Sequence, residues 1–116
     1  MDGVYLRLYV QEGRRLHGKL AWEWLLEQAL ALGVPGGTAV RAMAGFGRHG
    51  RMHEQHFFEL AGDVPVEVAF ALDAAQAEKL LQLVAEQSLP LFYVRLPAHF
   101  GTVGVPAGGE GEGGGR

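Results

Sequence analysis

Apolar residues in this chain repeat with two different periods, and the order of the periods is the strongest constraint on its fold. Alternation with period two, typical of a strand with one buried face, runs through residues 4–10 and 64–72. Apolar residues recur at helical spacing over 20–32 and again between Asp73 and Ser88. Two more segments, 38–45 and 91–96, have the composition of strands. The predicted order is strand, helix, strand, strand, helix, strand.

Both predicted helices carry end signals. Gly33 and the following Pro35 end the first helix, because glycine adopts the left-handed conformation easily and proline cannot continue a helix. Asp73 with Gln76 three residues later is a capping box that starts the second. We expect each helix to bury one apolar stripe. In the first helix the stripe is formed by Trp22, Leu25, Leu26, Ala29 and Leu30, and in the second by Ala77, Leu80, Leu81 and Val84.

Some aromatic and histidine side chains have predicted places in this scheme. Trp22 and Trp24 are two residues apart on a helix and cannot share a face. We expect Trp22 in the core and Trp24 at a boundary between subunits. His17 is expected at the entry to the first helix, and His99 in the tail.

The element order predicts an α+β fold of the ferredoxin-like type, with a four-stranded antiparallel sheet and two helices on one face. A length of 116 residues with 48% hydrophobic content suits one domain. Residues 101–116 are rich in glycine and lack apolar periodicity, so we expect a folded domain over 1–100 and a disordered tail over 101–116.

The composition of the chain excludes several classes of partner and of active site. The formal net charge of −3 argues against nucleic acid as the partner. No cysteine is present, which excludes disulfides, thiolate metal sites and a cysteine nucleophile. No apolar run is long enough to span a bilayer, and the first residues lack a signal-peptide pattern. We expect a cytoplasmic protein that is not embedded in a membrane.

The segment 45–51 concentrates the residues that suggest a binding site. Glycine loops let a ligand approach backbone N–H groups, and guanidinium groups bind phosphate or carboxylate. The topology places the connection 12–18, the hairpin loop and the connection after the second helix at one end of the sheet. The rim there would hold Arg14, Arg15, His17, Arg48, His49, Arg51 and His53. We expect an anionic ligand, a nucleotide above all, at Gly45, Phe46, Gly47, Arg48, His49, Arg51, Arg14 and Arg15. The alternative is that Arg14 and Arg15 pair with Glu12 or Glu54.

One face of the predicted sheet has no helix over it. Met43, Ala69, Ala71 and either Phe92 or Tyr93 are expected there, where a solvated face would carry charges. The sequence therefore predicts a homo-oligomer. The alternative is scattered surface hydrophobicity that needs no partner.

Three parts of the chain carry a family resemblance: LRLYVQEGRRLHGKLAWEWLLEQALALGVPGGTAVRAMAGFG, a following strand that contains histidine, and GDVPVEVAFALD with the helix after it. They resemble the PII-like family catalogued as domain-of-unknown-function family 190. The match covers about residues 4–96. TAVRAMAGFGRHG and VPVEVAFALDAAQAEKLLQLV are also similar to the PII signal-transduction proteins. The resemblance implies a ferredoxin-like trimer with small-molecule sites between subunits and no catalysis. It also implies that the 47–54 loop contacts a regulated transporter, channel or enzyme.

The chain departs from the PII pattern at two places. PII proteins hold nucleotide phosphates with a glycine-rich loop before the last strand, whereas this chain has Glu86-Gln87-Ser88-Leu89-Pro90 there. His49 stands where the glutamine after Gly-Phe-Gly-Arg is usual. The carry-over from PII proteins is therefore limited to Gly45, Phe46, Gly47 and Arg48.

Three other functions remain open. His49, His53 and His56 could bind a divalent metal in a CutA-like trimer, although His53 and His56 would project to opposite faces of a strand. A structural trimer could act through protein contacts alone. An enzyme could use His49 or His53 as a general base with Arg48 as an oxyanion donor, but no nucleophile accompanies them. We therefore expect a binding protein without a resident cofactor.

Overall fold

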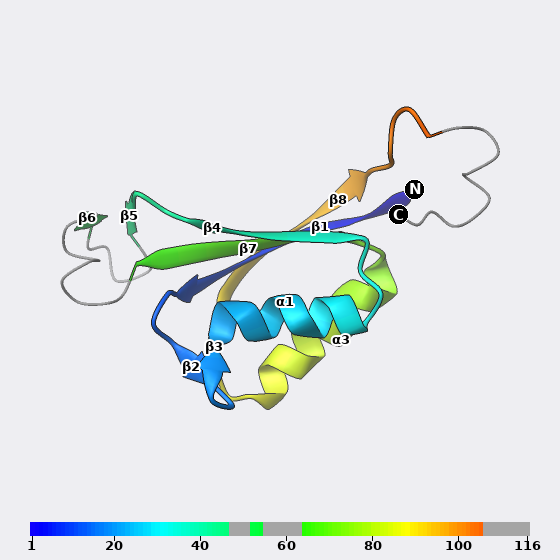
Figure 1. Ribbon diagram of the computed structural model, residues 1–116. Coiled ribbons are helices and arrows are strands. Elements are labelled where there is room, and N and C mark those ends of the chain that lie inside the picture. The colour runs from blue at the N-terminus through cyan, green and yellow to red at the C-terminus, as the bar shows by residue number, and fades with distance from the viewer. Residues whose placement is uncertain (47–51, 55–63, 106–116) are drawn as a thin grey trace.

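The four long strands form one antiparallel sheet, and the two described helices cover the same face of it (Figure 1). The computed structural model describes residues 1–46, 52–54 and 64–105. The strand order β4-β7-β1-β8 confirms the predicted ferredoxin-like fold. The elements are β1 (Asp2–Gln11), β2 (Arg15–Leu16), β3 (Lys19–Leu20), α1 (Ala21–Ala31), β4 (Gly36–Arg41), β5 (Ala44–Phe46), β6 (Met52–Glu54), β7 (Pro65–Leu72), α3 (Ala74–Glu86) and β8 (Phe92–His99).

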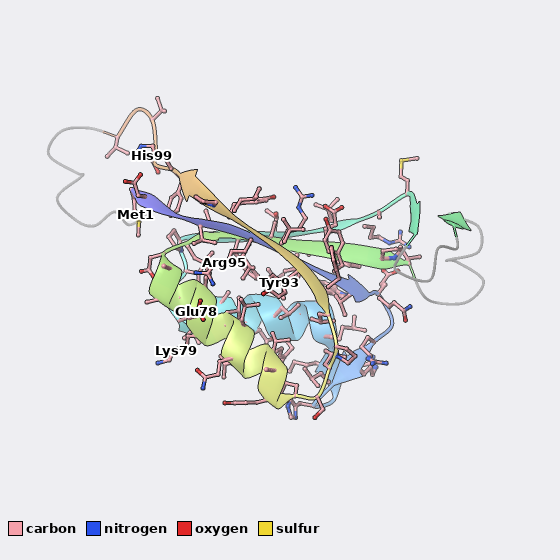
Figure 2. The ribbon with its side chains drawn as sticks, turned by 180° about the vertical axis from the view of Figure 1, so that it is seen from behind. Met1, Glu78, Lys79, Tyr93, Arg95 and His99 are labelled. Atoms are coloured by element: carbon pink, nitrogen blue, oxygen red, sulfur yellow. The ribbon has the colours of Figure 1, made fainter. Side chains whose placement is uncertain are left out.

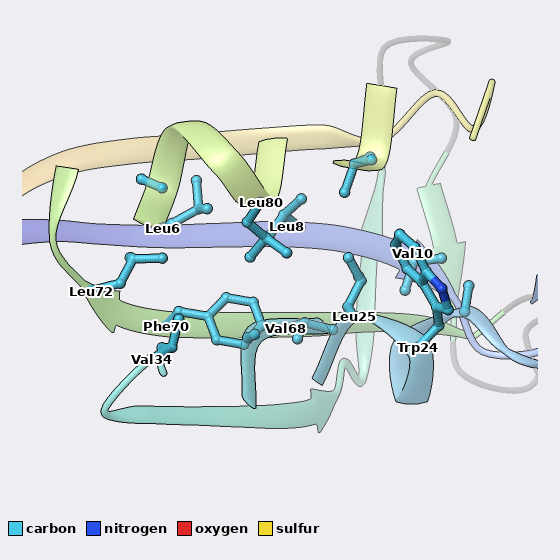
Figure 3. Packing of buried hydrophobic residues seen from close by; sticks show 14 of the residues in the cluster. Leu6, Leu8, Val10, Trp24, Leu25, Val34, Val68, Phe70, Leu72 and Leu80 are labelled. Carbon is cyan, nitrogen blue, oxygen red and sulfur yellow. The ribbon is translucent and has the colours of Figure 1, made fainter. Parts of the chain in front are cut away.

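The core lies between the sheet and the helices. Along β1 and β7 every second residue is buried, as the period-two pattern predicts. The register sets Leu6 opposite Phe70 and Leu8 opposite Val68, and none of these four side chains is more than 1% exposed. Burial of each stabilises the fold by about 1.5–3 kcal/mol relative to an exposed side chain. Figure 3 shows these residues packed in one layer with side chains from both helices.

The uncovered side of the sheet, which we call the open face, carries the residues that alternate with the core. Ala69 and Ala71 lie there, as predicted, and Phe92 lies there because it pairs with Tyr9. Tyr93 pairs with Leu8 and so belongs to the helix side. Met43, 74% exposed, follows the end of β4. The central residues of the open face are Tyr5, Arg7, Tyr9, Thr38, Val40, Glu67, Ala69, Ala71, Phe92, Val94 and Leu96.

The face of α1 that packs on the core differs from the predicted stripe. Trp24 is 5% exposed and belongs to the core, whereas Trp22 is only half-buried and Leu30 is 77% exposed. The predicted boundary position of Trp24 was therefore wrong, and Trp22 packs only partly against the core. The predicted and observed stripes share Leu25 and Ala29, so the apolar pattern alone did not distinguish two rotations of the helix about its axis.

Both predicted helix boundaries are confirmed by their capping groups. Gly33 has φ +81° just after α1, in the left-handed region that glycine favours. At α3, Asp73 Oδ1 accepts from the Gln76 backbone N–H at 2.7 Å, and Gln76 Oε1 accepts from the Asp73 backbone N–H at 3.0 Å. Gln76 Nε2 also donates to the Leu32 carbonyl at the end of α1, at 3.2 Å. Of the helices among the described residues, none is long and apolar enough to cross a membrane.

The predicted strand over 38–45 is divided in two. β4 ends at Arg41, where the Ala42 backbone N–H donates to the Pro65 carbonyl at 2.9 Å. β5 then pairs with β6 in a separate two-stranded sheet, with Gly45 opposite His53. The interruption at 42–43 lets the hairpin leave the end of the main sheet instead of extending it (Figure 1).

The last strand is longer than predicted. β8 continues through His99, whose Nδ1 lies 2.8 Å from Asp2 Oδ1, so its assignment to the tail was wrong. The Phe100 backbone N–H donates to the Met1 carbonyl at 2.9 Å, and Figure 2 shows Met1 and His99 at the same end of the sheet. The disordered tail over 101–116 stays a prediction, and residues 106–116 lie outside the described chain.

Close packing makes one glycine necessary. Gly37 pairs with Phe70 across β4 and β7, and a Cβ atom at Gly37 would lie 2.6 Å from a Phe70 ring carbon. Its neighbour Gly36 has no such atom within 4 Å of the corresponding position. Glycine at residue 37 therefore allows the fully buried ring of Phe70 to lie against the backbone of β4.

We predict that Gly37→Ala lowers the free energy of unfolding by about 1–3 kcal/mol, because Phe70 must move within a close-packed core. Gly36→Ala is the matched control and should change stability by less than about 1 kcal/mol. Urea unfolding followed by circular dichroism measures both. Equal effects of the two substitutions would contradict the assigned role of Gly37.

The capping box gives a second prediction. Asp73→Ala removes the acceptor for the Gln76 backbone N–H and should cost about 1 kcal/mol of stability. Asp73→Ser keeps an acceptor oxygen and should retain most of it. The same urea titrations compare the variants, and a Ser variant no more stable than the Ala variant would show that the cap contributes little.

Candidate functional site

Three strand ends are tied together at one end of the sheet. The Glu12 backbone N–H, just past β1, donates to the Val64 carbonyl before β7 at 2.7 Å. Arg41 at the end of β4 makes an ion pair with Glu12, with Nη2 and Oε1 3.2 Å apart. The two small hairpins, β2–β3 and β5–β6, project from the same end (Figure 1). The segments that follow β1 and β4 and the segment that precedes β7 therefore lie together at one end of the sheet.

A cavity of about 220 Å³ lies at this end, between β1 and the connection after α3. Its lining combines apolar and aromatic side chains with the polar side chains of Gln11 and Arg14. The topology predicts that the connection after β1 and the connection after α3 lie at the same end of the sheet. Residues of both connections line the cavity. Its lining residues are Tyr9, Val10, Gln11, Arg14, Leu89, Pro90 and Leu91.

Arg14 and Arg15 have different surroundings. The Arg14 backbone is fixed from both sides, since its N–H donates to the Gln11 carbonyl at 3.0 Å and its carbonyl accepts from the Ala21 N–H at 2.8 Å. Its side chain lines the cavity and forms no ion pair with any residue that the structure describes. Arg15 does not line the cavity; its Nη1 donates to the Gly18 carbonyl at 3.3 Å.

The connection between β1 and α1 is itself a small hairpin, which the sequence did not predict. His17 and Gly18 form its two-residue turn with φ values of +54° and +80°, as in a type I′ turn. His17 is thus a turn residue, and the prediction of a helix-entry position was wrong. Its Nε2 lies 2.6 Å from Gln87 Oε1, in a hydrogen bond between the two side chains. Since Gln87 is the C-cap of α3, this bond connects the hairpin to the segment that carries Leu89.

The residues predicted in the glycine loop are only partly within the described chain. Gly45 and Phe46 lie in β5, opposite His53 and Met52, at the base of the small hairpin. Gly47, Arg48, His49 and Arg51 lie outside the described residues, as does His56 of the predicted metal site. Within the described ranges, no three or more His, Asp or Glu side chains come together in a way that could hold a metal ion. Ligand binding by all eight predicted residues stays a prediction.

The connection after α3 differs chemically from a phosphate cradle. Gln87 caps the helix, Ser88 has φ +54°, and Leu89 is 8% exposed in the core. Leu89 and Pro90 therefore line this side of the cavity with apolar side chains. A phosphate cradle has instead the backbone N–H groups of a glycine-rich turn, which bind phosphate directly. In the described residues, Arg14 is the cationic group that lines this cavity.

Comparison with solved structures defines the class of protein. The fold is PII-like: it resembles CPII of Thiomonas intermedia K12, a nitrogen regulatory PII-like protein solved bound to ADP, AMP and bicarbonate, with a TM-score of 0.56 and 20% identity over 84% of this chain and 89% of that one. It also resembles a putative PII-like signaling protein from Thermus thermophilus, with a TM-score of 0.54 and 14% identity over 84% and 90% of the two chains. At these identities the likeness establishes the fold.

Sequence comparison then places the chain in one family. Residues 3–89 match the family DUF190, described as "Uncharacterized ACR, COG1993", and the chain belongs to this family. It is also 30% identical over 77 residues to a UPF0166 protein of Aquifex aeolicus (strain VF5), covering 66% of this chain and 73% of that protein. The predicted resemblance is therefore confirmed.

Proposed function

We propose that the chain is a PII-like regulatory protein that binds a small anionic ligand, a nucleotide, in clefts between the subunits of a homotrimer. It acts in the cytoplasm on a transporter, channel or enzyme through the 47–54 loop. The observation that carries the proposal is the cavity with Arg14, at the end of the sheet where the β5–β6 hairpin projects. The nucleotides and bicarbonate bound to CPII give the same ligand chemistry in a protein of the same fold.

The chemistry of the cavity supports an anion with an apolar or aromatic part. A guanidinium group donates paired hydrogen bonds to phosphate or carboxylate, and Arg14 has no ion pair among the described residues to compete with this. Tyr9 and Pro90 add an aromatic ring and an apolar side chain to the lining of the cavity. No cofactor is needed for this role, and binding without turnover is expected.

The size of the cavity supports a site completed by a second subunit. Small-molecule sites typically enclose about 300–1,000 Å³, whereas the cavity in one chain has about 220 Å³. A neighbouring copy could close the cleft and contribute its own loop. Ligand contacts with Arg48 and the glycine backbone would then connect occupancy of the cleft with the loop that contacts the partner.

We predict that calorimetric titration with ADP, AMP, ATP, cyclic nucleotides and bicarbonate identifies a ligand that binds without being consumed. Arg14→Ala and Arg48→Ala should each raise its Kd about 10- to 100-fold, because a hydrogen bond to a charged group contributes about 1.5–3 kcal/mol. Both variants should keep the oligomeric state of the wild type.

Lys79→Ala is the matched control, since Lys79 is exposed on α3 and does not line the cavity (Figure 2). It removes one positive charge and should leave Kd unchanged. Unchanged affinity in both arginine variants would refute the assigned site. Binding of divalent metals alone would favour the histidine site, and product formation from the bound ligand would favour an enzyme.

A further inference from the structure

The β2–β3 hairpin, with Arg14 at its base, is held at its tip as well. At the base, the Ala21 N–H donates to the Arg14 carbonyl at 2.8 Å. At the tip, His17 Nε2 and Gln87 Oε1 lie 2.6 Å apart. Among the residues that the structure describes, this is the side-chain hydrogen bond that joins the hairpin to the end of α3. Figure 1 shows the hairpin beside that end of the helix.

Further contacts orient the Gln87 amide and the His17 ring. Gln87 Nε2 donates to the Leu83 carbonyl in the last turn of α3, at 3.3 Å, so the amide oxygen faces the hairpin. Because this oxygen can only accept, the Nε2 atom of His17 carries the proton and donates it. The centroid of the same ring lies 6.3 Å from that of the buried Trp24 ring, within the range of an aromatic pair. The His17 ring is therefore positioned by both helices.

The backbone at His17 also points to a role of its side chain. Its φ of +54° lies in the left-handed region, and Asn-Gly is the favoured pair for a turn of this type. Residues kept in such a conformation often serve a function that the conformation makes possible. The turn itself does not need an imidazole, whereas the bond to Gln87 needs a donor on a long side chain.

The bond between His17 and Gln87, which we call the clasp, joins the two sides of the cavity. Arg14 lines one side from the base of the hairpin, and Leu89 and Pro90 line the other from the segment that follows the C-cap of α3. Leu89 is buried, so its side is anchored in the core. The clasp therefore limits how far Arg14 can move away from the apolar side.

We propose that His17 and Gln87 are positioning residues for the ligand of this cavity. Their bond sets the separation of the two sides before a ligand arrives, and so reduces the ordering that binding requires. The anionic group of the ligand is then held at Arg14 while its uncharged part contacts Pro90. This inference rests on the proposed function, and it adds to the site two residues that do not themselves line the cavity.

The test is a double-mutant cycle on ligand affinity, measured by calorimetric titration with ADP, AMP, ATP and bicarbonate. His17→Asn suits the turn but is too short to reach Gln87, and Gln87→Met keeps the length of the side chain and removes the acceptor. Each should raise Kd about 3- to 10-fold, the contribution of one hydrogen bond. The double variant should bind within about twofold of either single variant, since both substitutions remove the same bond.

Lys19→Met is the matched control. Lys19 lies in the same hairpin and its Nζ is 2.6 Å from Glu27 Oε1 on α1, but neither residue lines the cavity. The substitution removes a contact between the hairpin and α1 and leaves the clasp intact. Kd should change by less than about twofold, because an exposed ion pair contributes little.

Hydrogen exchange followed by NMR tests the clasp without any ligand. The Ala21 N–H should exchange about 3- to 10-fold faster in His17→Asn and in Gln87→Met, because a hairpin released at its tip opens more often at its base. Gln87→Glu keeps an acceptor oxygen at the same length and should keep the wild-type rate. Circular dichroism verifies that every variant is folded.

The outcomes separate this inference from the proposed function. Wild-type protein that binds none of the four compounds would overturn the proposed function and the positioning role with it. Binding that Arg14→Ala weakens but that His17→Asn and Gln87→Met leave unchanged would overturn this inference alone. Additive losses of affinity in the double variant, or Ala21 exchange at the wild-type rate in both single variants, would do the same.

Discussion

The packing of β1 against β7 determines where every other part of the molecule lies. Leu6 and Leu8 face the helices together with Val68 and Phe70, and these side chains exclude water almost completely. Because side chains alternate along a strand, burying this set directs the intervening residues to the opposite side. The same constraint therefore creates the apolar core and the open face, and it sends the ends of β1, β4 and β7 to the edge that carries the cavity.

Much of the fold could be predicted from sequence because its signals are local. Period-two alternation, the Asp73 capping box and Gly33 act over a few residues, and all were located correctly. The rotation of α1 about its axis was not predicted correctly, because two possible apolar stripes share Leu25 and Ala29. Only the shape of the core selects Trp24 over Trp22 for burial. Tertiary packing decides such choices.

The candidate site was less predictable, because its contacts join residues far apart in the chain. Two-residue strands such as β2 and β3 have no periodicity to detect, and the bond between His17 and Gln87 spans 70 positions. The topology predicted that Arg14 would lie near the connection after α3. Nothing in the local sequence indicated that Tyr9 and Leu89 would form walls of the same cavity. The glycine at residue 18 was the available signal for the turn.

Tyr9 belongs to two surfaces at once. It lines the cavity, its hydroxyl accepts from Arg7 on the open face, and its ring centroid lies 5.7 Å from that of Phe92. If copies of the chain associate through the open face, binding in the cavity and binding between copies share this side chain, and such coupling is reciprocal. The apparent ligand affinity would then depend on the concentration of the protein itself. The cellular concentration of the protein would then be a second variable, beside the level of the metabolite, that sets how much ligand is bound.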